Sequence, residues 1–350
     1  MIQRSQKPRI YEEHRIPTKD GNYLYAKLMF PKPPMNAKRL LFLPPLVGAS
    51  ASQSLIIFRS LCRRGAILLS YEYEGHPRST GTFELDDTVV DTHHAIRWAD
   101  RFACEHGLPM HGVAMCYGLV SILAAQFKKD QTNKVVSNRT GSTSPFWSIT
   151  AMSGLFNLEQ IIDFRGFIKL YGQNLGRELD QESFLRGIKE GIFDWKSDTF
   201  RNSLQEFFQN LFPEISISND HFAELVYDRV NFSNLLRQFV EANYLKDIYV
   251  PPEIPCSFLF GRHDTLLGIN HSERREEYFD MMRAIVPHGI VTFIADADHN
   301  GCGPDRTRIL EHMGDMCEEA EAKAVPLAIQ NQETDTESLA NKDTQHQINQ

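Results

Sequence analysis

The stretch MHGVAMCYGLVSI, residues 110–122, sets the pattern for the rest of this 350-residue chain. It begins apolar and strand-like, turns through residues 114–118, and continues into a helix-forming segment. A tight strand-to-helix turn needs small residues two places before and two places after its central residue, because larger side chains would collide with the neighbouring backbone. Such a turn lifts the central side chain, here Cys116, above the sheet edge. The pentapeptide also leaves open a plain buried cysteine at a helix start.

Strand-like and helix-like segments alternate on both sides of this turn. An Asp-Gly pair joins the first two strand-like runs, as in a hairpin, and the later apolar runs are typical of buried parallel strands. The alternation predicts an α/β fold, a mostly parallel central sheet with helices on both faces. The expected strands are 11–18, 23–30, 39–43, 66–71, one that begins at 110 and leads into the turn at 114–118, 146–152, 254–260 and 289–295. The expected helices are 54–64, 87–106, one from that turn to about 129, 272–286 and 305–323.

We expect one catalytic domain over residues 1–324. From about 154 to 250 the pattern becomes Phe-rich and helical, which predicts a helical insertion that covers the sheet as a substrate lid. Its phenylalanines, Phe167 among them, either line an acyl pocket or form ordinary core. Residues 325–350 are polar and almost free of apolar side chains, so we expect a disordered tail.

Composition excludes several classes of protein. A net charge of −8 without a basic stripe argues against a nucleic-acid partner, and no apolar run is long enough to span a membrane. The polar, basic N-terminus is not a secretory signal. The six cysteines are scattered, without zinc-like spacing, which indicates reduced thiols in the cytoplasm. Nothing in the sequence requires a metal or redox cofactor.

Two further loops carry candidate catalytic side chains. Asp264 follows the apolar run 254–260, and His299 follows the last predicted strand. Catalytic groups of open α/β sheets collect at the carboxyl ends of strands, and the order nucleophile, acid, histidine is that of α/β-hydrolases. In this interpretation Asp264 orients His299, and His299 takes the proton from Cys116 and later returns it.

Over about residues 10–322 the chain resembles the α/β-hydrolase superfamily. Within it, three segments are similar to the bacterial bioluminescence myristoyl-ACP thioesterases: residues 18–24 (TKDGNYL), 73–81 (YEGHPRSTG) and 83–98. Those thioesterases carry serine at the elbow, where this chain carries Cys116.

The resemblance also implies an oxyanion hole. One donor is the backbone N–H of Tyr117, and the other comes from the loop after residues 39–43, at Leu46 or Val47. Pro44 and Pro45 stand where the family usually has His-Gly, and proline has no N–H to donate.

Cysteine at the elbow changes the expected chemistry. A cysteine that attacks a thioester forms another thioester, so the acyl group stays ready for transfer to a second thiol. The aminoacyl shuttles of nonribosomal-peptide pathways use this design. We therefore expect acyl or aminoacyl transfer between thiols, with the acyl group delivered by a carrier protein or CoA. The alternatives are a thioesterase or ester hydrolase with a Cys-His-Asp triad, and a non-catalytic hydrolase fold used for binding.

Overall fold

The computed structural model describes residues 10–32, 36–45, 50–128, 144–154, 164–194, 197–211, 244–264, 272–294, 296–297 and 305–323. The predicted tail at 325–350 lies outside these ranges, and so do residues 155–163, 195–196 and 212–243 of the predicted lid insertion. Among the described residues, no helix combines the length and the apolar character needed to cross a bilayer.

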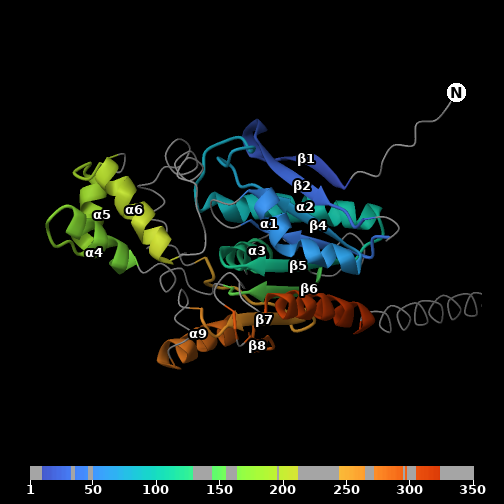
Figure 1. The fold of residues 1–350 in the computed structure, drawn as a ribbon. Coiled ribbons are helices and arrows are strands. Elements are labelled where there is room, and N and C mark those ends of the chain that lie inside the picture. Colours follow the sequence, from blue (N-terminus) through green and yellow to red (C-terminus); the bar gives the residue numbers. More distant parts are fainter. Residues whose placement is uncertain are drawn as a thin grey trace, which may run out of the picture.

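An eight-stranded sheet forms the centre of the molecule, as the alternating pattern predicts (Figure 1). Its strand order is β1-β2-β4-β3-β5-β6-β7-β8. Only β2 runs antiparallel to its neighbours, and the contacts from β4 to β8 are parallel. The strands are β1 (Tyr11–Pro17), β2 (Tyr23–Met29), β3 (Arg39–Leu43), β4 (Ala66–Tyr71), β5 (Met110–Met115), β6 (Phe146–Met152), β7 (Cys256–Gly261) and β8 (Ile290–Ile294).

The N-terminal hairpin forms where the Asp-Gly pair predicts it. Between β1 and β2 the chain turns through a single 3-10 turn, Lys19–Gly21, and Gly21 takes the left-handed conformation with φ 78°. Thr18 at this turn donates a 2.5 Å hydrogen bond to the carboxylate of Glu74, in the loop after β4. The hairpin is therefore fastened to the sheet edge where the strand-end loops lie.

Helices cover both faces of the sheet, because side chains of the inner strands alternate between two hydrophobic clusters. In β3, Leu40 and Phe42 belong to the larger cluster, whereas Leu41 and Leu43 belong to the smaller one. The larger cluster is completed by α2 (Asp87–Glu105), α3 (Tyr117–Phe127) and α9 (Ser272–Ile285). The smaller cluster is completed by α1 (Ala51–Phe58), the 3-10 helix η2 (Arg59–Arg64) and a C-terminal helix over residues 306–323.

Three helices from the predicted lid form a group of their own: α4 (Phe164–Asn174), α5 (Gln181–Lys189) and α6 (Asp198–Leu211). Figure 1 shows them beyond the sheet edge to which the parallel strands point. Phe167 is buried among Tyr171, Phe184 and Phe200, with ring centroids 5.5 to 6.1 Å apart. Of the two roles expected for Phe167, the structure supports core.

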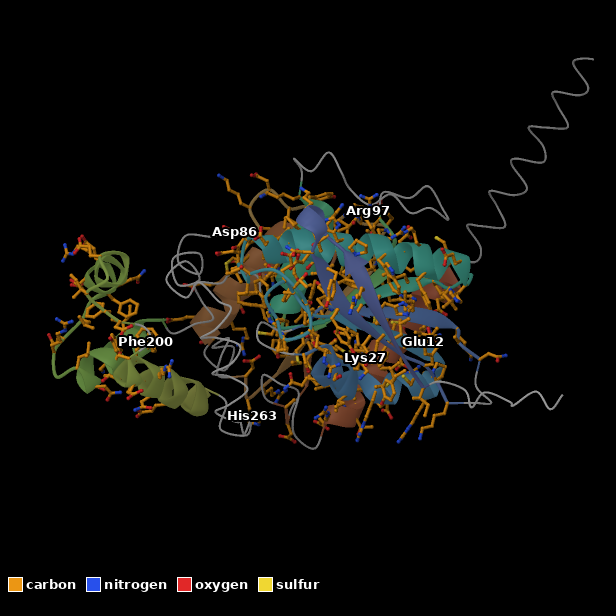
Figure 2. The ribbon with its side chains drawn as sticks, turned by 90° about the horizontal axis from the view of Figure 1, so that it is seen from above. Glu12, Lys27, Asp86, Arg97, Phe200 and His263 are labelled. Atoms are coloured by element: carbon orange, nitrogen blue, oxygen red, sulfur yellow. The ribbon has the colours of Figure 1, made fainter. Side chains whose placement is uncertain are left out.

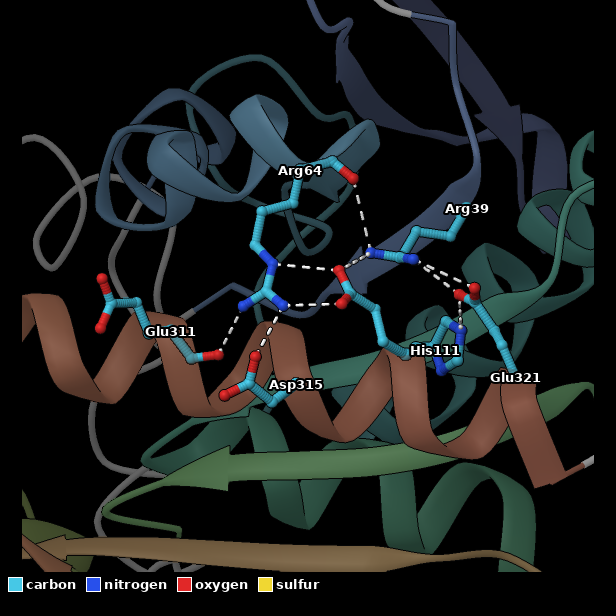
Figure 3. Close-up of polar contacts among 7 residues, drawn as sticks. Arg39, Arg64, His111, Glu311, Asp315 and Glu321 are labelled. Carbon is cyan, nitrogen blue, oxygen red and sulfur yellow. Dashed lines mark hydrogen bonds and ion pairs between the residues drawn. The ribbon is translucent and has the colours of Figure 1, made fainter.

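Charged side chains join the C-terminal helix to the opposite, amino-terminal edge of the sheet (Figure 3). Arg39, almost fully buried at the start of β3, lies 2.5 Å from Glu321 and 3.2 Å from Glu318. Arg64 also pairs with Glu318, and His111 on β5 lies 3.1 Å from Glu321. These ion pairs hold the C-terminal helix against the amino-terminal edge of the sheet.

Candidate active site

Cys116 occupies the turn between β5 and α3. Its backbone has φ 51° and ψ −127°, in a region that residues with a side chain seldom adopt. The conformation is held because the Cys116 N–H donates to the Met152 carbonyl (3.2 Å), while its own carbonyl accepts from the Leu119 N–H (3.2 Å). The thiol is only partly buried, although every residue of β5 is buried. Strain that lifts one side chain out of a buried strand end is the geometry of a nucleophile elbow.

The small residues around Cys116 have the role that the sequence predicts. A Cβ built on Gly118 would lie 3.2 Å from the carbonyl oxygen of Pro44, at the end of β3. Ala114 is fully buried and pairs with Ala151 of β6. The elbow therefore packs directly against the backbone from which the second oxyanion donor is expected. Leu46 and Val47 themselves lie outside the described residues.

Asp264 lies just past β7, two strands from β5 in the sheet. Its side chain is completely buried, and its backbone N–H donates to the Gly261 carbonyl at 3.1 Å. A buried carboxylate needs a hydrogen-bond donor or a positive partner. The histidine that is predicted to lie beside Asp264 would be such a partner. The predicted base, His299, lies outside the described residues.

The segment that leads toward position 299 is nevertheless tied to the Asp264 loop. The His263 N–H donates to the Ala297 carbonyl at 3.1 Å, and the His263 ring lies 3.6 Å from the Asp296 carboxylate. Asp296 and Ala297 follow β8, which pairs with β7 along its length. In Figure 2 His263 lies on the side of the molecule that faces α6, the helix that carries Phe200. The loops after β7 and β8 therefore meet at the carboxyl edge.

Tyr278, on α9, belongs to the site although the sequence reasoning did not select it. Its buried hydroxyl donates a hydrogen bond to the carbonyl of Gly154, at the end of β6. Burial raises the pKa of Tyr278 well above its ordinary value, and the nearby charges of Asp264 and Cys116 raise it further. The phenol is thus neutral and within electrostatic range of two candidate catalytic groups. From the sequence, the helical spacing of Tyr278 with Met282 and Ile285 indicates only that the three residues share the buried face of a helix.

Ser153 is a second residue that the sequence did not reveal. It follows β6 directly, adopts φ 47°, and is fully buried. Its N–H donates to the Leu259 carbonyl at 2.8 Å, but its hydroxyl has no hydrogen-bond partner among the described residues. Adjacent strands β5 and β6 therefore each end in a residue with positive φ, and one of them carries an unsatisfied hydroxyl. Such features concentrate at functional sites.

Several solved structures have a similar fold. Hypothetical protein PA2218 from Pseudomonas aeruginosa matches with a TM-score of 0.54 and 13% identity, covering 88% of this chain and 93% of its own. A candidate aryl esterase from Burkholderia cenocepacia matches at 0.51 and 14%, covering 89% and 100%. A candidate hydrolase from Agrobacterium vitis S4 matches at 0.51 and 14%, covering 88% and 99%. The chain has the α/β-hydrolase fold. No family model and no curated protein matches the sequence.

In this α/β-hydrolase fold, the last described residue before the predicted oxyanion donors, Pro45, is bonded to a buried tyrosine. The Tyr73 hydroxyl lies 3.2 Å from the Pro45 carbonyl and 3.1 Å from the Ser121 hydroxyl, which in turn donates to the Gly118 carbonyl. Tyr117, the other expected donor, is the first residue of α3, and its buried side chain bonds Thr88 at 2.7 Å. The first turn of α3 and the start of the loop are thereby held in a fixed relation.

The segment 73–81, which carried part of the family resemblance, forms a compact loop beside the hairpin. Gly75 has φ 74°, and a Cβ there would lie 2.2 Å from the Phe83 backbone nitrogen, so no other residue fits. Buried Glu72 accepts from the backbone N–H groups of Ala51 and Arg78. The motif therefore positions the start of α1 and the loop. Among the described residues, no three His, Cys, Asp or Glu side chains gather as a metal site requires.

Proposed function

We propose that the protein is an acyltransferase that moves an acyl or aminoacyl group between thiols through a thioester on Cys116. The observation that carries the proposal is a partly exposed cysteine in the strained elbow of an α/β-hydrolase fold, with the buried carboxyl of Asp264 two strands away. The expected partner is a carrier protein, or CoA, that presents the acyl group as a thioester.

In the proposed first step, His299 takes the proton of the Cys116 thiol, and the sulfur attacks the carbonyl carbon of the bound thioester. The negative oxygen that forms is stabilised by the N–H of Tyr117 and by the N–H of Leu46 or Val47. The bond to the donor sulfur then breaks, and His299 returns the proton to the departing thiol. Asp264 stabilises the protonated histidine.

The second step is the reverse with a different thiol. The acceptor thiol gives its proton to His299 and attacks the Cys116 thioester, and the cysteine leaves as a thiol again. Because each step breaks one thioester and forms another, the free energy of the thioester bond is retained. A serine at the elbow would form an oxygen ester, from which return to a thiol is uphill. This difference favours transfer over hydrolysis.

Hydrolysis is the second candidate, since the same groups that activate a thiol also activate water. The esterase and hydrolase names of two structural neighbours are compatible with this alternative. A purely binding role is the third, and the retained elbow strain at Cys116 speaks against it, because strain persists where a site uses it.

The test is intact-protein mass spectrometry after mixing the protein with a panel of acyl- and aminoacyl-N-acetylcysteamine thioesters. Wild type is expected to gain the mass of one acyl group, and an added thiol such as pantetheine is expected to remove it. Cys116→Ala is expected to gain nothing. Cys104→Ala, at another partly buried cysteine, serves as the matched control and is expected to behave as wild type.

The outcomes separate the three candidates. An adduct discharged to the added thiol supports transfer, whereas free acid without a lasting adduct supports a cysteine hydrolase. Acylation that persists in Cys116→Ala, or no acylation and no turnover with any donor, overturns the proposal.

A further inference from the structure

A basic groove lies outside the candidate active site, between the α1–η2 segment and the C-terminal helix. It encloses about 800 Å³ and is lined by both helical segments. Four arginines, Arg59, Arg63, Arg64 and Arg306, and one acidic residue, Glu311, line it. The chain as a whole carries a net charge of −8, so this concentration of positive charge is local.

The four arginines are not equivalent. Arg64 is neutralised by Asp315 and Glu318 at 2.6 and 2.9 Å, as part of the cluster in Figure 3. Arg59 and Arg63 are exposed, and neither forms an ion pair with another described residue. Two exposed guanidinium groups that lack a carboxylate partner among the described residues attract a negatively charged surface.

An apolar side chain stands beside these charges. Ile56 is 55% exposed, and it lines the groove together with Arg59 and Arg63. The Ser60 hydroxyl, also in the groove, is buried without a hydrogen-bond partner among the described residues. A surface with an exposed isoleucine next to free arginines fits a partner helix that has acidic residues around an apolar one.

The groove extends between the two edges of the sheet. Arg64, at one end, belongs to the amino-edge cluster of Figure 3. Ile57 and Leu310, which also line the groove, pack against the hydrophobic cluster of this sheet face. Arg306 donates to the Ile57 carbonyl at 3.4 Å. It directly follows Asp305, whose carboxylate accepts from the Asp296 N–H just past β8. A protein seated on the groove would therefore extend from the amino-edge cluster toward the loop after β8, at the carboxyl edge.

We propose that this groove docks the acidic face of the carrier protein that delivers the acyl group to Cys116. The inference rests on the proposed function and specifies its donor. The occupant is a protein surface with acidic residues on a helix, because the attraction comes from guanidinium groups spread along a helix and the apolar contact from Ile56.

The experiment compares one acyl group on two donors. Octanoyl-loaded acyl carrier protein presents an acidic protein surface, and octanoyl-N-acetylcysteamine presents none. The variant Arg59→Glu/Arg63→Glu is expected to raise KM for the carrier-bound donor about tenfold or more, with kcat unchanged, and to leave KM for the small donor unaltered. Raising the salt concentration is expected to raise the carrier KM of wild type far more than that of the variant.

Arg97→Glu/Arg101→Glu is the matched control. This pair is exposed, has the same spacing, and lies on α2, which covers the other face of the sheet (Figure 2). It is expected to keep the wild-type KM for both donors. Equal effects of the two double variants, or a parallel rise in KM for both donors, would overturn the docking site.

Binding is measured separately, by calorimetry of holo-acyl carrier protein with Cys116→Ala. Affinity that falls about tenfold with Arg59→Glu/Arg63→Glu supports the groove even if no acyl transfer occurs. In that case only the proposed reaction fails. Absence of binding, or binding that is insensitive to the charge reversal, overturns the inference while leaving Cys116 acylation by small donors intact.

Discussion

Gly118 and Pro44 lie so close that a Cβ on the glycine would sit 3.2 Å from the proline carbonyl oxygen and 3.3 Å from its Cβ. The contact joins the first turn of the helix after Cys116 to the strand end that leads into the predicted oxyanion loop. The relative position of nucleophile and expected donor is therefore set by the absence of one side chain.

Gly118→Val is expected to move these two elements apart. Overpacking should lower the free energy of unfolding by about 1–3 kcal/mol and, by displacing reacting groups, lower turnover by roughly tenfold to hundredfold. Gly107→Ala is the control, because Gly107 has φ 67° with open space around it. That variant should lose stability from backbone strain but keep turnover. Full activity of Gly118→Val would contradict the role given to this contact.

Cys116→Ser is expected to change the product. The serine intermediate is an oxygen ester, so its acyl group should pass to water more readily than to a thiol. Simultaneous measurement of free acid and acylated acceptor should show the ratio of transfer to hydrolysis falling at least tenfold. An unchanged ratio would mean that the identity of the nucleophile does not govern the outcome. Cys104→Ser should leave the ratio as in wild type.

Tyr278→Phe removes only the hydroxyl that bonds the Gly154 carbonyl. We expect a loss of about 1–2 kcal/mol in the free energy of unfolding, because a buried carbonyl loses its donor. Turnover should fall severalfold, because the end of β6 supports the Cys116 N–H through Met152. Tyr249→Phe, at a tyrosine that is 46% exposed, is the control for loss of a phenol. Equal changes in the two variants would argue against a special role of Tyr278.

Ser153→Ala tests the unsatisfied hydroxyl beside the elbow. Removing a buried polar group without a partner should leave the free energy of unfolding unchanged or raise it by about 1 kcal/mol. Turnover is expected to fall severalfold, since a hydroxyl kept at such a cost is expected to meet substrate. Chemical denaturation and steady-state kinetics on one preparation measure both. A less stable variant with normal turnover would be the opposite result.

Asp91 predicts a pH dependence of stability. Burial raises its pKa to about 8, with the charges of Glu74 and Asp87 adding to the effect, although the Glu74 N–H donates to its carboxylate at 2.8 Å. The folded state therefore holds a proton that the unfolded state releases near pH 4. The raised pKa therefore contributes to the free energy of unfolding. This stabilisation is complete below pH 4 and is lost as the pH rises to 8, by at most about 1.4 kcal/mol per pH unit.

Asp91→Asn should remove that slope. In urea unfolding between pH 5 and 8, the free energy of unfolding of the variant should increase relative to that of wild type as the pH rises. Burial lowers the pKa of His76 to about 4, and this group changes stability in the opposite direction. It is present in both proteins, so the difference between them isolates Asp91. A difference that does not vary with pH would contradict the raised pKa.

Patterns that are local in sequence predicted most of the fold. The hairpin, the parallel strands and the elbow at Cys116 follow from apolar periodicity, an Asp-Gly pair and small residues at fixed offsets, and the structure confirms them. Asp264 is confirmed at a strand end. Its role with His299 stays a prediction, as do the oxyanion donors at Leu46 or Val47 and at Tyr117.

What the sequence did not reveal depends on contacts between distant segments. Tyr278 looks like any apolar helix position until α9 packs against the end of β6. The strain at Ser153 depends on the neighbouring strands, and serine itself gives no sign of it. Arg59 and Arg63 become distinctive only because the C-terminal helix supplies carboxylates to Arg64 and none to them.

The pairing of Arg39 with Glu321 spans 282 residues of chain. A guanidinium buried before its carboxylates exist would be an unpaired charge in the core, at a cost of several kcal/mol. Stable packing of β3 against β5 is therefore expected only after the helix at 306–323 has been synthesised. The sheet is therefore expected to form late and slowly, and chaperones are expected to shield its half-built core in the meantime.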